Sequence, residues 1–262
     1  MSIKDDKPTT ITLEKIGTIM WLTGWSLPDS VFDQLRLLLP DFHHISAEYS
    51  NANSPEELLP ITETTIRKII SRDEEARPAK LEHEPLLLAG WSLGSLLALK
   101  LAAKGYGDGL ILFSATAHFT HSTEMNIHGW SDAHIRGMIR GILTDRVTVE
   151  ARFRQLMFME EDSEYGIVTL PPAGSWTSSA LIAGLQILRN EQCLSELPHI
   201  DIPVLLVHGI EDKVCPYDAV LEIVERLPRA TLIALPNCGH VPFLGKEAHI
   251  VKEIRGWWHD KR

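Results

Sequence analysis

The chain has 262 residues, and at about 150 residues per domain this length predicts one large domain or two small ones. Apolar residues make up 44% of the chain and charged residues 23%, proportions that are typical of a globular protein and argue against disorder, coiled coil and collagen. The net charge of -10 repels phosphate backbones and anionic lipid headgroups, so we expect neither nucleic acid nor a membrane surface as a partner.

The cysteines and the first residues indicate a compartment. Three cysteines are too few and too scattered for a disulfide framework, and their odd number favours a reducing environment. The first ten residues are polar and lack the apolar segment of a signal peptide, and no apolar run approaches the ~20 residues of a membrane helix. We therefore expect a cytoplasmic protein, and we expect it to be a monomer.

Short apolar runs alternate with amphipathic segments along the chain, which predicts a parallel β-sheet flanked by helices. Several of the apolar runs are nearly continuous Leu, Ile and Val, as strands covered on both faces should be. The fold class is therefore α/β, with a mostly parallel, doubly wound sheet. The predicted strands are residues 9–13, 17–22, 44–48, 85–89, 109–113, 203–207 and 231–234, and the predicted helices between them are residues 31–39, 61–71, 93–104, 217–227 and 248–258.

The alternation breaks between residues 118 and 197, where helical patterns dominate at residues 133–143, 148–159 and 176–190. About 80 residues without a comparable strand are too many for a loop in a compact domain. We expect a helical insertion, most simply a lid over the strand ends, between two parts of one core formed by residues 1–117 and 198–262. A structural decoration remote from the site is the alternative.

The Gly-Trp-Ser-Leu-Gly run at residues 90–94 lies between a predicted strand and a predicted helix. The flanking glycines allow a sharp strand-to-helix turn with a nucleophile at its tip. The helix N-terminus adds N–H groups and a positive dipole that favour a developing oxyanion. The motif therefore predicts Ser92 as a nucleophile, with a chemically inert Gly/Ser turn as the alternative.

A nucleophilic serine needs a base, and the base needs an orienting acid. In this arrangement the acid and then the histidine follow the serine along the chain. Asp212 follows the predicted strand 203–207, and His240 follows the predicted strand 231–234, so both fall at carboxyl ends of neighbouring strands. We predict Asp212 as the acid and His240 as the base. Glu211 is a competitor for the acid, and we interpret His208 as a polar group at the strand end.

The oxyanion hole of such a site takes one N–H from the residue after the nucleophile, here Leu93, and a second from the loop after an earlier strand. In that loop Gly24 allows close backbone approach and Trp25 can supply its amide. Trp25 as an ordinary buried aromatic residue is compatible with the same role.

A metal site is the competing interpretation for a group of residues in the insertion. No recognised ligand spacing occurs among them, and no cysteine lies near, so we predict neither a metal nor a cofactor. These residues are His118, His121, His128 and His134, with Glu124 and Asp132 among them.

Five segments together resemble one known family. They are Gly24-Trp25, the run at 90–94, Gly-Leu-Gln-Ile-Leu-Arg at 184–189, Gly-Ile-Glu-Asp at 209–212 and Gly-His-Val-Pro-Phe at 239–243. On them the chain resembles, over nearly its whole length, the BioH-type pimeloyl-[acyl-carrier protein] methyl ester esterases of the α/β-hydrolase superfamily. The triad motifs are shared across that superfamily, whereas Trp-Ser-Leu, the Gly-Trp loop and the Gly-Leu-x-Ile-Leu stretch are narrower.

The resemblance implies an α/β-hydrolase fold with a helical lid and the same Ser92, Asp212 and His240 triad. It also implies substrate contacts from Trp25, Leu93, Phe153, Arg154, Gln155, Leu156 and Met157. Two departures stand out: Thr23 replaces the histidine that the family has before the oxyanion glycine, and residues 48–53 replace a glycine-rich turn.

An acyl-carrier protein is acidic, so its partner surface must be locally basic. Arginine suits that surface because it forms forked hydrogen bonds to phosphate. A solvated helix face is the plain alternative. The candidate arginines are Arg136, Arg140, Arg146, Arg152 and Arg154.

These features together predict a serine carboxylesterase that hydrolyses an acyl methyl ester. The resemblance implies pimeloyl-[acyl-carrier protein] methyl ester as the substrate, with the free acid and methanol as products in biotin synthesis. A broad short-chain carboxylesterase is the alternative within the same class. A non-catalytic binding protein is the alternative from another class, and the intact Ser, Asp and His argue against it.

Overall fold

A computed structural model describes residues 15–76, 83–121, 129–158, 170–172 and 174–261. The strand predicted at residues 9–13 lies outside the described residues. The other six predicted strands are confirmed, each with its ends within two residues of the prediction.

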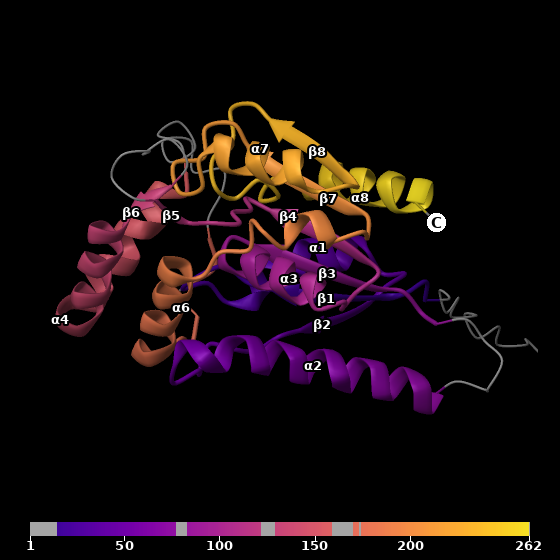
Figure 1. The fold of residues 1–262 in the computed structure, drawn as a ribbon, viewed down its shortest axis with the longest axis horizontal. Coiled ribbons are helices and arrows are strands. Elements are labelled where there is room, and N and C mark those ends of the chain that lie inside the picture. Colours follow the sequence, from indigo (N-terminus) through magenta and orange to yellow (C-terminus); the bar gives the residue numbers. More distant parts are fainter. Residues whose placement is uncertain (1–14, 77–82, 122–128, 159–169, 173, 262) are drawn as a thin grey trace, which may run out of the picture.

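The core of the molecule is a six-stranded sheet in which every neighbouring pair is parallel (Figure 1). All residues of β1, β3, β4 and β7 are buried, as their continuous apolar sequences predicted. The strand order is β2-β1-β3-β4-β7-β8. The strands are β1 (Thr18–Leu22), β2 (His43–Ser46), β3 (Leu86–Trp91), β4 (Gly109–Phe113), β7 (Val204–Gly209) and β8 (Ala230–Leu235).

Helices connect these strands, and the five helices predicted around the sheet are present. Among them α1 packs against α8 and α2 against α3. The first predicted helix is divided into a 3-10 turn, η1, and the short α1. The bounds are η1 (Asp29–Phe32), α1 (Asp33–Leu38), α2 (Pro55–Ala76), α3 (Leu93–Ala103), α7 (Tyr217–Arg226) and α8 (Glu247–Lys261), with a further 3-10 turn, η2 (Leu197–His199), before β7.

The described part of the segment between β4 and β7 is mainly helical. It contains α4 (Asp132–Leu156) and α6 (Ser178–Asn190), and Figure 1 shows them at one end of the molecule. Helix α6 packs against both α4 and α2, which joins the insertion to the core. Two strands of two residues each, β5 (Thr120–His121) and β6 (Trp130–Ser131), were not predicted, because so short a pair leaves no period-2 pattern.

Helix α4 is kinked where the sequence predicted a break between two helices. Asp145 has φ -151° and ψ 74°, which are not helical values. Its Oδ1 accepts a hydrogen bond from the Thr148 N–H at 3.2 Å. Asp145 is therefore the N-cap of the second half of the helix. That half carries Glu150 and Phe153, which contact Ser26 and Trp25 in the loop after β1. Among the described helices, none has the length and apolar character needed to cross a bilayer.

Candidate active site

Ser92 is the single residue between the end of β3 and the start of α3. Its φ of 57° lies in the left-handed region, which is strained for a residue with a side chain. The two glycines of the motif permit this turn: a Cβ on Gly90 would lie 2.4 Å from the carbonyl oxygen of Gly94, and a Cβ on Gly94 would lie 2.0 Å from that of Leu22. The sharp turn predicted from the motif is therefore present.

Asp212 and His240 follow β7 and β8, and their side chains meet in the interior. His240 Nδ1 lies 2.8 Å from Asp212 Oδ2, and both side chains are fully buried. The other carboxylate oxygen, Oδ1, accepts hydrogen bonds from the N–H groups of Val214 and Cys215 at 2.8 and 2.9 Å. Burial raises the pKa of Asp212, but the charge and hydrogen bond of His240 and the Cys215 N–H outweigh it, so the pKa lies below its ordinary value.

The backbone of His240 is held from two sides. Its carbonyl oxygen accepts a hydrogen bond from Trp91 Nε1 at 2.8 Å, and its N–H donates to the Met157 carbonyl oxygen at 2.9 Å. The imidazole Nε2 is buried and has no hydrogen-bond partner among the described residues. The residue before Ser92 and the end of α4 thus fix an imidazole that has one ring nitrogen unused.

Ser92 belongs to the same cluster through Cys215. Burial and the negative charge of Asp212 raise the pKa of the Cys215 thiol well above its usual value, and a hydrogen bond with the Ser92 side chain acts in the opposite direction. Asp212 and His240, two of the residues predicted as the triad, are therefore in direct contact. The third, Ser92, follows Trp91, whose indole N–H donates to the His240 carbonyl oxygen.

The competitor Glu211 faces elsewhere. Its Oε2 accepts a hydrogen bond from the Cys238 N–H at 3.1 Å, so it holds the loop after β8 and makes no contact with the His240 ring. His208 is more than a polar strand end. It is fully buried, and its Nε2 lies 2.8 Å from the Cys215 carbonyl oxygen and 3.5 Å from Asp212 Oδ2. Its position four residues before Asp212, across a tight turn, was the signal for this contact.

Trp25, predicted as one oxyanion donor, lies in the loop after β1, and Leu93, predicted as the other, is the first residue of α3. Neither backbone N–H donates a hydrogen bond to another described residue. Gly24 allows the loop to approach β3, since a Cβ there would lie 3.0 Å from the Trp91 ring. The Trp25 side chain is buried against the insertion: its Nε1 donates to the Leu181 carbonyl oxygen at 2.7 Å, and its ring meets Phe153 edge-on at 4.9 Å.

The loop that carries Trp25 is closed by its own hydrogen bonds. Thr23, which stands where the family has histidine, points its Oγ1 back toward the Leu27 carbonyl oxygen at 3.3 Å. The Tyr49 hydroxyl donates to the Thr23 carbonyl oxygen at 2.5 Å. Tyr49 belongs to residues 48–53, the second segment that departs from the family pattern, so the two departures contact each other.

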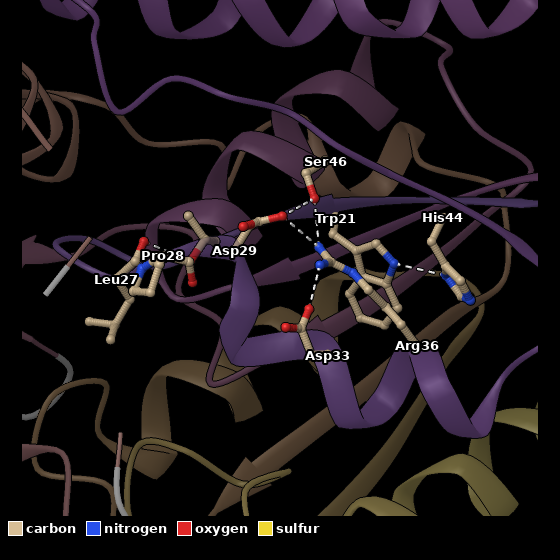
Figure 2. Close-up of polar contacts among 9 residues, drawn as sticks. Trp21, Leu27, Pro28, Asp29, Asp33, Arg36, His44 and Ser46 are labelled. Atoms are coloured by element: carbon tan, nitrogen blue, oxygen red, sulfur yellow. Dashed lines mark hydrogen bonds and ion pairs between the residues drawn. The ribbon is translucent and has the colours of Figure 1, made fainter. Parts of the chain in front are cut away.

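Figure 2 shows a polar network centred on Arg36 of α1, formed in part by residues that follow this loop in the chain. The guanidinium lies 2.9 Å from Asp33 and 3.2 Å from Asp29, donates to Ser46 Oγ at 2.6 Å, and sits over the Trp21 ring at 5.8 Å. It joins η1 and α1 to the carboxyl ends of β1 and β2. The residues that follow the loop are thereby anchored to the sheet.

A cavity of about 1240 Å³, here called the insertion cavity, lies along α4. Phe153, Arg154, Gln155 and Leu156, which were predicted to contact substrate, line it, whereas the predicted Met157 is buried beside His240. Its described walls include neither Ser92 nor the predicted oxyanion residues. The further lining residues include Trp130, Met138, Arg152, Phe158, Leu170 and Lys213.

The five arginines predicted to meet a carrier protein differ in their surroundings. Arg136 is paired with Asp132, and Arg146 Nε lies 2.6 Å from Glu150 Oε2. Arg154 is half-buried and donates to the Pro171 carbonyl oxygen at 2.8 Å. Arg140 and Arg152 are exposed and form no hydrogen bond or ion pair with a carboxylate of the described residues. Two of the five candidate arginines, Arg136 and Arg146, are therefore already paired with carboxylates of α4.

The residues considered for a metal are only partly described. Among the described residues, no group of three or more His, Cys, Asp or Glu side chains is arranged to hold a metal ion. Glu124 and His128 lie outside the described residues. Asp132 instead pairs with Arg136 and Arg189, and the His134 ring packs against Trp130 at 4.5 Å.

The fold and the arrangement of these residues define a class, and comparison with known proteins agrees. Residues 20–250 match the model of the alpha/beta hydrolase family, and the chain belongs to that family.

Individual relatives are more distant. The pimeloyl-[acyl-carrier protein] methyl ester esterase of Nitrosomonas europaea is 30% identical over 168 residues, which cover 60% of this chain and 65% of that protein. The matched region thus spans slightly less than two thirds of that relative's length. The AB hydrolase superfamily protein YisY of Bacillus subtilis is 27% identical over 95% of both chains. An esterase structure from Exiguobacterium antarcticum superposes with a TM-score of 0.71 at 20% identity, covering 93% of this chain and 92% of that one.

Proposed function

We propose that this protein is a serine-dependent carboxylic ester hydrolase with Ser92 as nucleophile, His240 as general base and Asp212 as the orienting acid. The observation that carries the proposal is the buried hydrogen bond between His240 and Asp212 beside the strained turn at Ser92. The Nε2 atom of His240 has no hydrogen-bond partner among the described residues, so it is free to take a proton.

The chemistry follows from the roles of these groups. His240 Nε2 takes the proton of the Ser92 hydroxyl while Oγ attacks the ester carbonyl carbon, and the N–H groups of Leu93 and Trp25 stabilise the resulting oxyanion. His240 returns the proton to the leaving alcohol, and the acyl group remains on Ser92. Water, activated by the same nitrogen, then releases the acid and frees the serine. Each oxyanion donor of this kind is worth about 3 kcal/mol.

We assign the insertion, residues 118–197, as a lid over this site. Three of its residues contact the Trp25 side chain: Phe153 of α4 meets its ring, Leu181 of α6 accepts its indole N–H, and Gly184 of α6 allows its close approach. Met157 binds the backbone N–H of His240. The insertion therefore contacts both a predicted oxyanion residue and the predicted base, which a remote decoration would not do.

For the substrate we propose the methyl ester of a pimeloyl chain carried by an acyl-carrier protein. The name of the Nitrosomonas europaea relative supports this choice, as do the five segments that resemble its family. The insertion cavity is lined mostly by apolar side chains, Met138, Phe153, Leu156 and Leu170 among them, which suit a flexible acyl chain. Arg140 and Arg152 are the basic residues we propose for the carrier.

A broad carboxylesterase of short acyl esters is the second candidate. It is favoured by the pairing of Arg136 and Arg146 with carboxylates of their own helix, which leaves less positive charge for an acidic carrier.

Two measurements test the proposal. A fluorophosphonate probe, which reacts with activated serines, should label the wild-type protein and not the Ser92→Ala variant. Absence of labelling in the wild type would overturn the hydrolase assignment. Hydrolysis of a pimeloyl-carrier methyl ester and of a free short-chain ester should then be compared, and a higher kcat/KM for the short-chain ester would favour the second candidate.

A further inference from the structure

A buried carboxylate of the insertion is bonded to the loop that carries Trp25. Glu150 lies in the second half of α4, and its Oε1 accepts a hydrogen bond from Ser26 Oγ at 2.5 Å. Ser26 has no exposed surface, and Glu150 is only 7% exposed. The two residues are 124 positions apart in the chain, and their hydrogen bond joins the insertion to the core loop.

The surroundings of Glu150 are limited to a few groups. Its other oxygen, Oε2, lies 2.6 Å from Arg146 Nε one turn earlier, and its charge raises the pKa of Arg154 one turn later, against a larger decrease caused by burial. A carboxylate withdrawn from water costs free energy unless charges and hydrogen bonds replace its hydration. Here Arg146 and Ser26 supply the charge and the hydrogen bond that replace this hydration. A buried charge kept at such a contact favours a role in fixing how α4 sits on the loop that carries Trp25.

Ser26 is itself in an unusual conformation. Its φ of 66° lies in the left-handed region, where a residue with a side chain is strained. Such strain persists when the surroundings over-determine the conformation, and it gathers at functional sites. The hydrogen bond to Glu150 is the one side-chain hydrogen bond of Ser26 with another described residue.

The neighbouring Trp25 is held by the same helix. Phe153, three residues after Glu150 and so on the same side of α4, meets the Trp25 ring edge-on. One face of α4 thus contacts two consecutive loop residues, one through a ring and one through a carboxylate.

We propose that Glu150 is a positioning residue that acts through Ser26, keeping the Trp25 N–H aimed at the oxyanion while the insertion is closed. This rests on the proposed function, in which the Trp25 N–H is an oxyanion donor. Such a donor acts on the transition state, so its misplacement lowers kcat and leaves KM for a small ester nearly unchanged.

The test measures kcat and KM for a short-chain nitrophenyl ester, together with thermal unfolding, in Ser26→Ala, Glu150→Ala and the double variant. Glu150→Gln is the conservative variant, since its side-chain oxygen can still accept from Ser26, and it keeps the experiment decisive if Glu150→Ala fails to fold. Glu222→Ala, which removes an exposed i,i+4 pair with Arg226 on α7, is the matched control.

We expect kcat to fall about tenfold or more in Ser26→Ala and Glu150→Ala, with KM within about twofold, and no change in Glu222→Ala. The double variant should resemble the single ones, because both remove the same interaction. Glu150→Gln should recover most of the lost kcat. A loss of thermal stability with kcat intact, or additive losses in the double variant, would overturn the proposal. Failure of the wild type to hydrolyse esters or to label with fluorophosphonate would instead contradict the proposed function.

Discussion

Gly184 of α6 and Trp25 approach each other so closely that no methyl group fits between them. A Cβ on Gly184 would lie 2.9 Å from Trp25 Cδ1 and 3.1 Å from Leu93 Cδ2. Both partners are the residues we propose as oxyanion donors. The glycine of the Gly-Leu-Gln-Ile-Leu-Arg segment, which supported the family resemblance, is therefore explained by packing against the site.

The first prediction concerns this contact. Gly184→Ala should destabilise the protein by about 1–3 kcal/mol, as overpacking in a core does, and should lower kcat about tenfold because Trp25 must move. Gly256→Ala is the matched control, since it lies in the helix α8 and a Cβ there meets nothing within 4 Å. It should leave kcat unchanged and stabilise the protein by up to about 1 kcal/mol. Thermal unfolding and steady-state kinetics check both, and equal behaviour of the two variants would contradict the prediction.

The second prediction concerns the nucleophile. Ser92→Ala should abolish ester hydrolysis, because the hydroxyl serves the chemistry and not packing. The unfolding midpoint should stay nearly unchanged, because the strained φ of 57° remains in the variant. It rises slightly if removal of the buried hydroxyl group stabilises the fold. Activity is measured on a nitrophenyl ester with thermal unfolding in parallel. More than a small residual fraction of wild-type activity in a clean preparation would exclude Ser92.

The acid is tested by comparing two neighbouring carboxylates. Asp212→Asn should preserve the fold and lower kcat on the order of 10⁴-fold, because the amide favours the wrong tautomer of His240. Glu211→Gln should have a far smaller effect, since Glu211 binds the Cys238 N–H and not the imidazole. Steady-state kinetics on both variants decides the assignment, and a reversed order would place the acid one residue earlier.

Much of this candidate site was predictable, because its main features leave patterns in short stretches of the sequence. Continuous apolar strands and glycines that require close backbone approach leave direct marks in the sequence, so β3, the turn at Ser92 and the ends of β7 and β8 were found. Helix α2 was predicted to begin after Pro60, yet it begins at Pro55, because one missing N–H early in a helix of 22 residues is tolerated.

The contacts that the sequence did not reveal are of two kinds. Some join residues that are distant in the chain, and others depend on side-chain conformation. The bond between Ser26 and Glu150 depends on how α4 docks on the loop, and no local pattern encodes it. Likewise, the pairs Arg136–Asp132 and Arg146–Glu150 depend on side-chain conformation, so the sequence could not show which candidate arginines are already paired.

The fourth prediction is a dependence of stability on pH. Burial lowers the pKa of His208 from the ordinary 6.5, against smaller opposing effects of Asp212 and the Cys215 carbonyl. Below about pH 6.5 the unfolded chain binds a proton at this residue that the folded protein does not, so the free energy of unfolding falls as the pH falls. The slope contributed by one such histidine is at most about 1.4 kcal/mol per pH unit.

His208→Gln should reduce this decrease between pH 7.5 and 5.5, since glutamine can donate to the Cys215 carbonyl oxygen without titrating. Denaturant unfolding at several pH values measures it. His44, whose pKa burial also lowers, contributes a second part that the variant should retain. An unchanged slope in His208→Gln would show that this residue does not titrate differently in the two states.

The last prediction separates carrier recognition from general esterase activity. Arg140 and Arg152 are exposed on α4 without a hydrogen-bonded carboxylate among the described residues, so they are the arginines able to attract an acidic carrier. Changing both to Glu should lower kcat/KM for a carrier-linked ester about tenfold or more, since exposed pairs are worth up to about 1 kcal/mol each and reversal adds repulsion. Added salt should weaken the wild-type preference in the same direction through screening.

A small uncharged nitrophenyl ester does not meet that surface, so the double variant should hydrolyse it at nearly the wild-type rate. Arg67→Glu combined with Arg72→Glu, both exposed arginines of α2 outside the insertion, controls for the same change in net charge. Because Arg152 also lines the insertion cavity, an equal loss on both esters would mean that it shapes the cavity instead. No loss on either ester would show that these arginines are a solvated helix face, and the broad carboxylesterase would then be the better assignment.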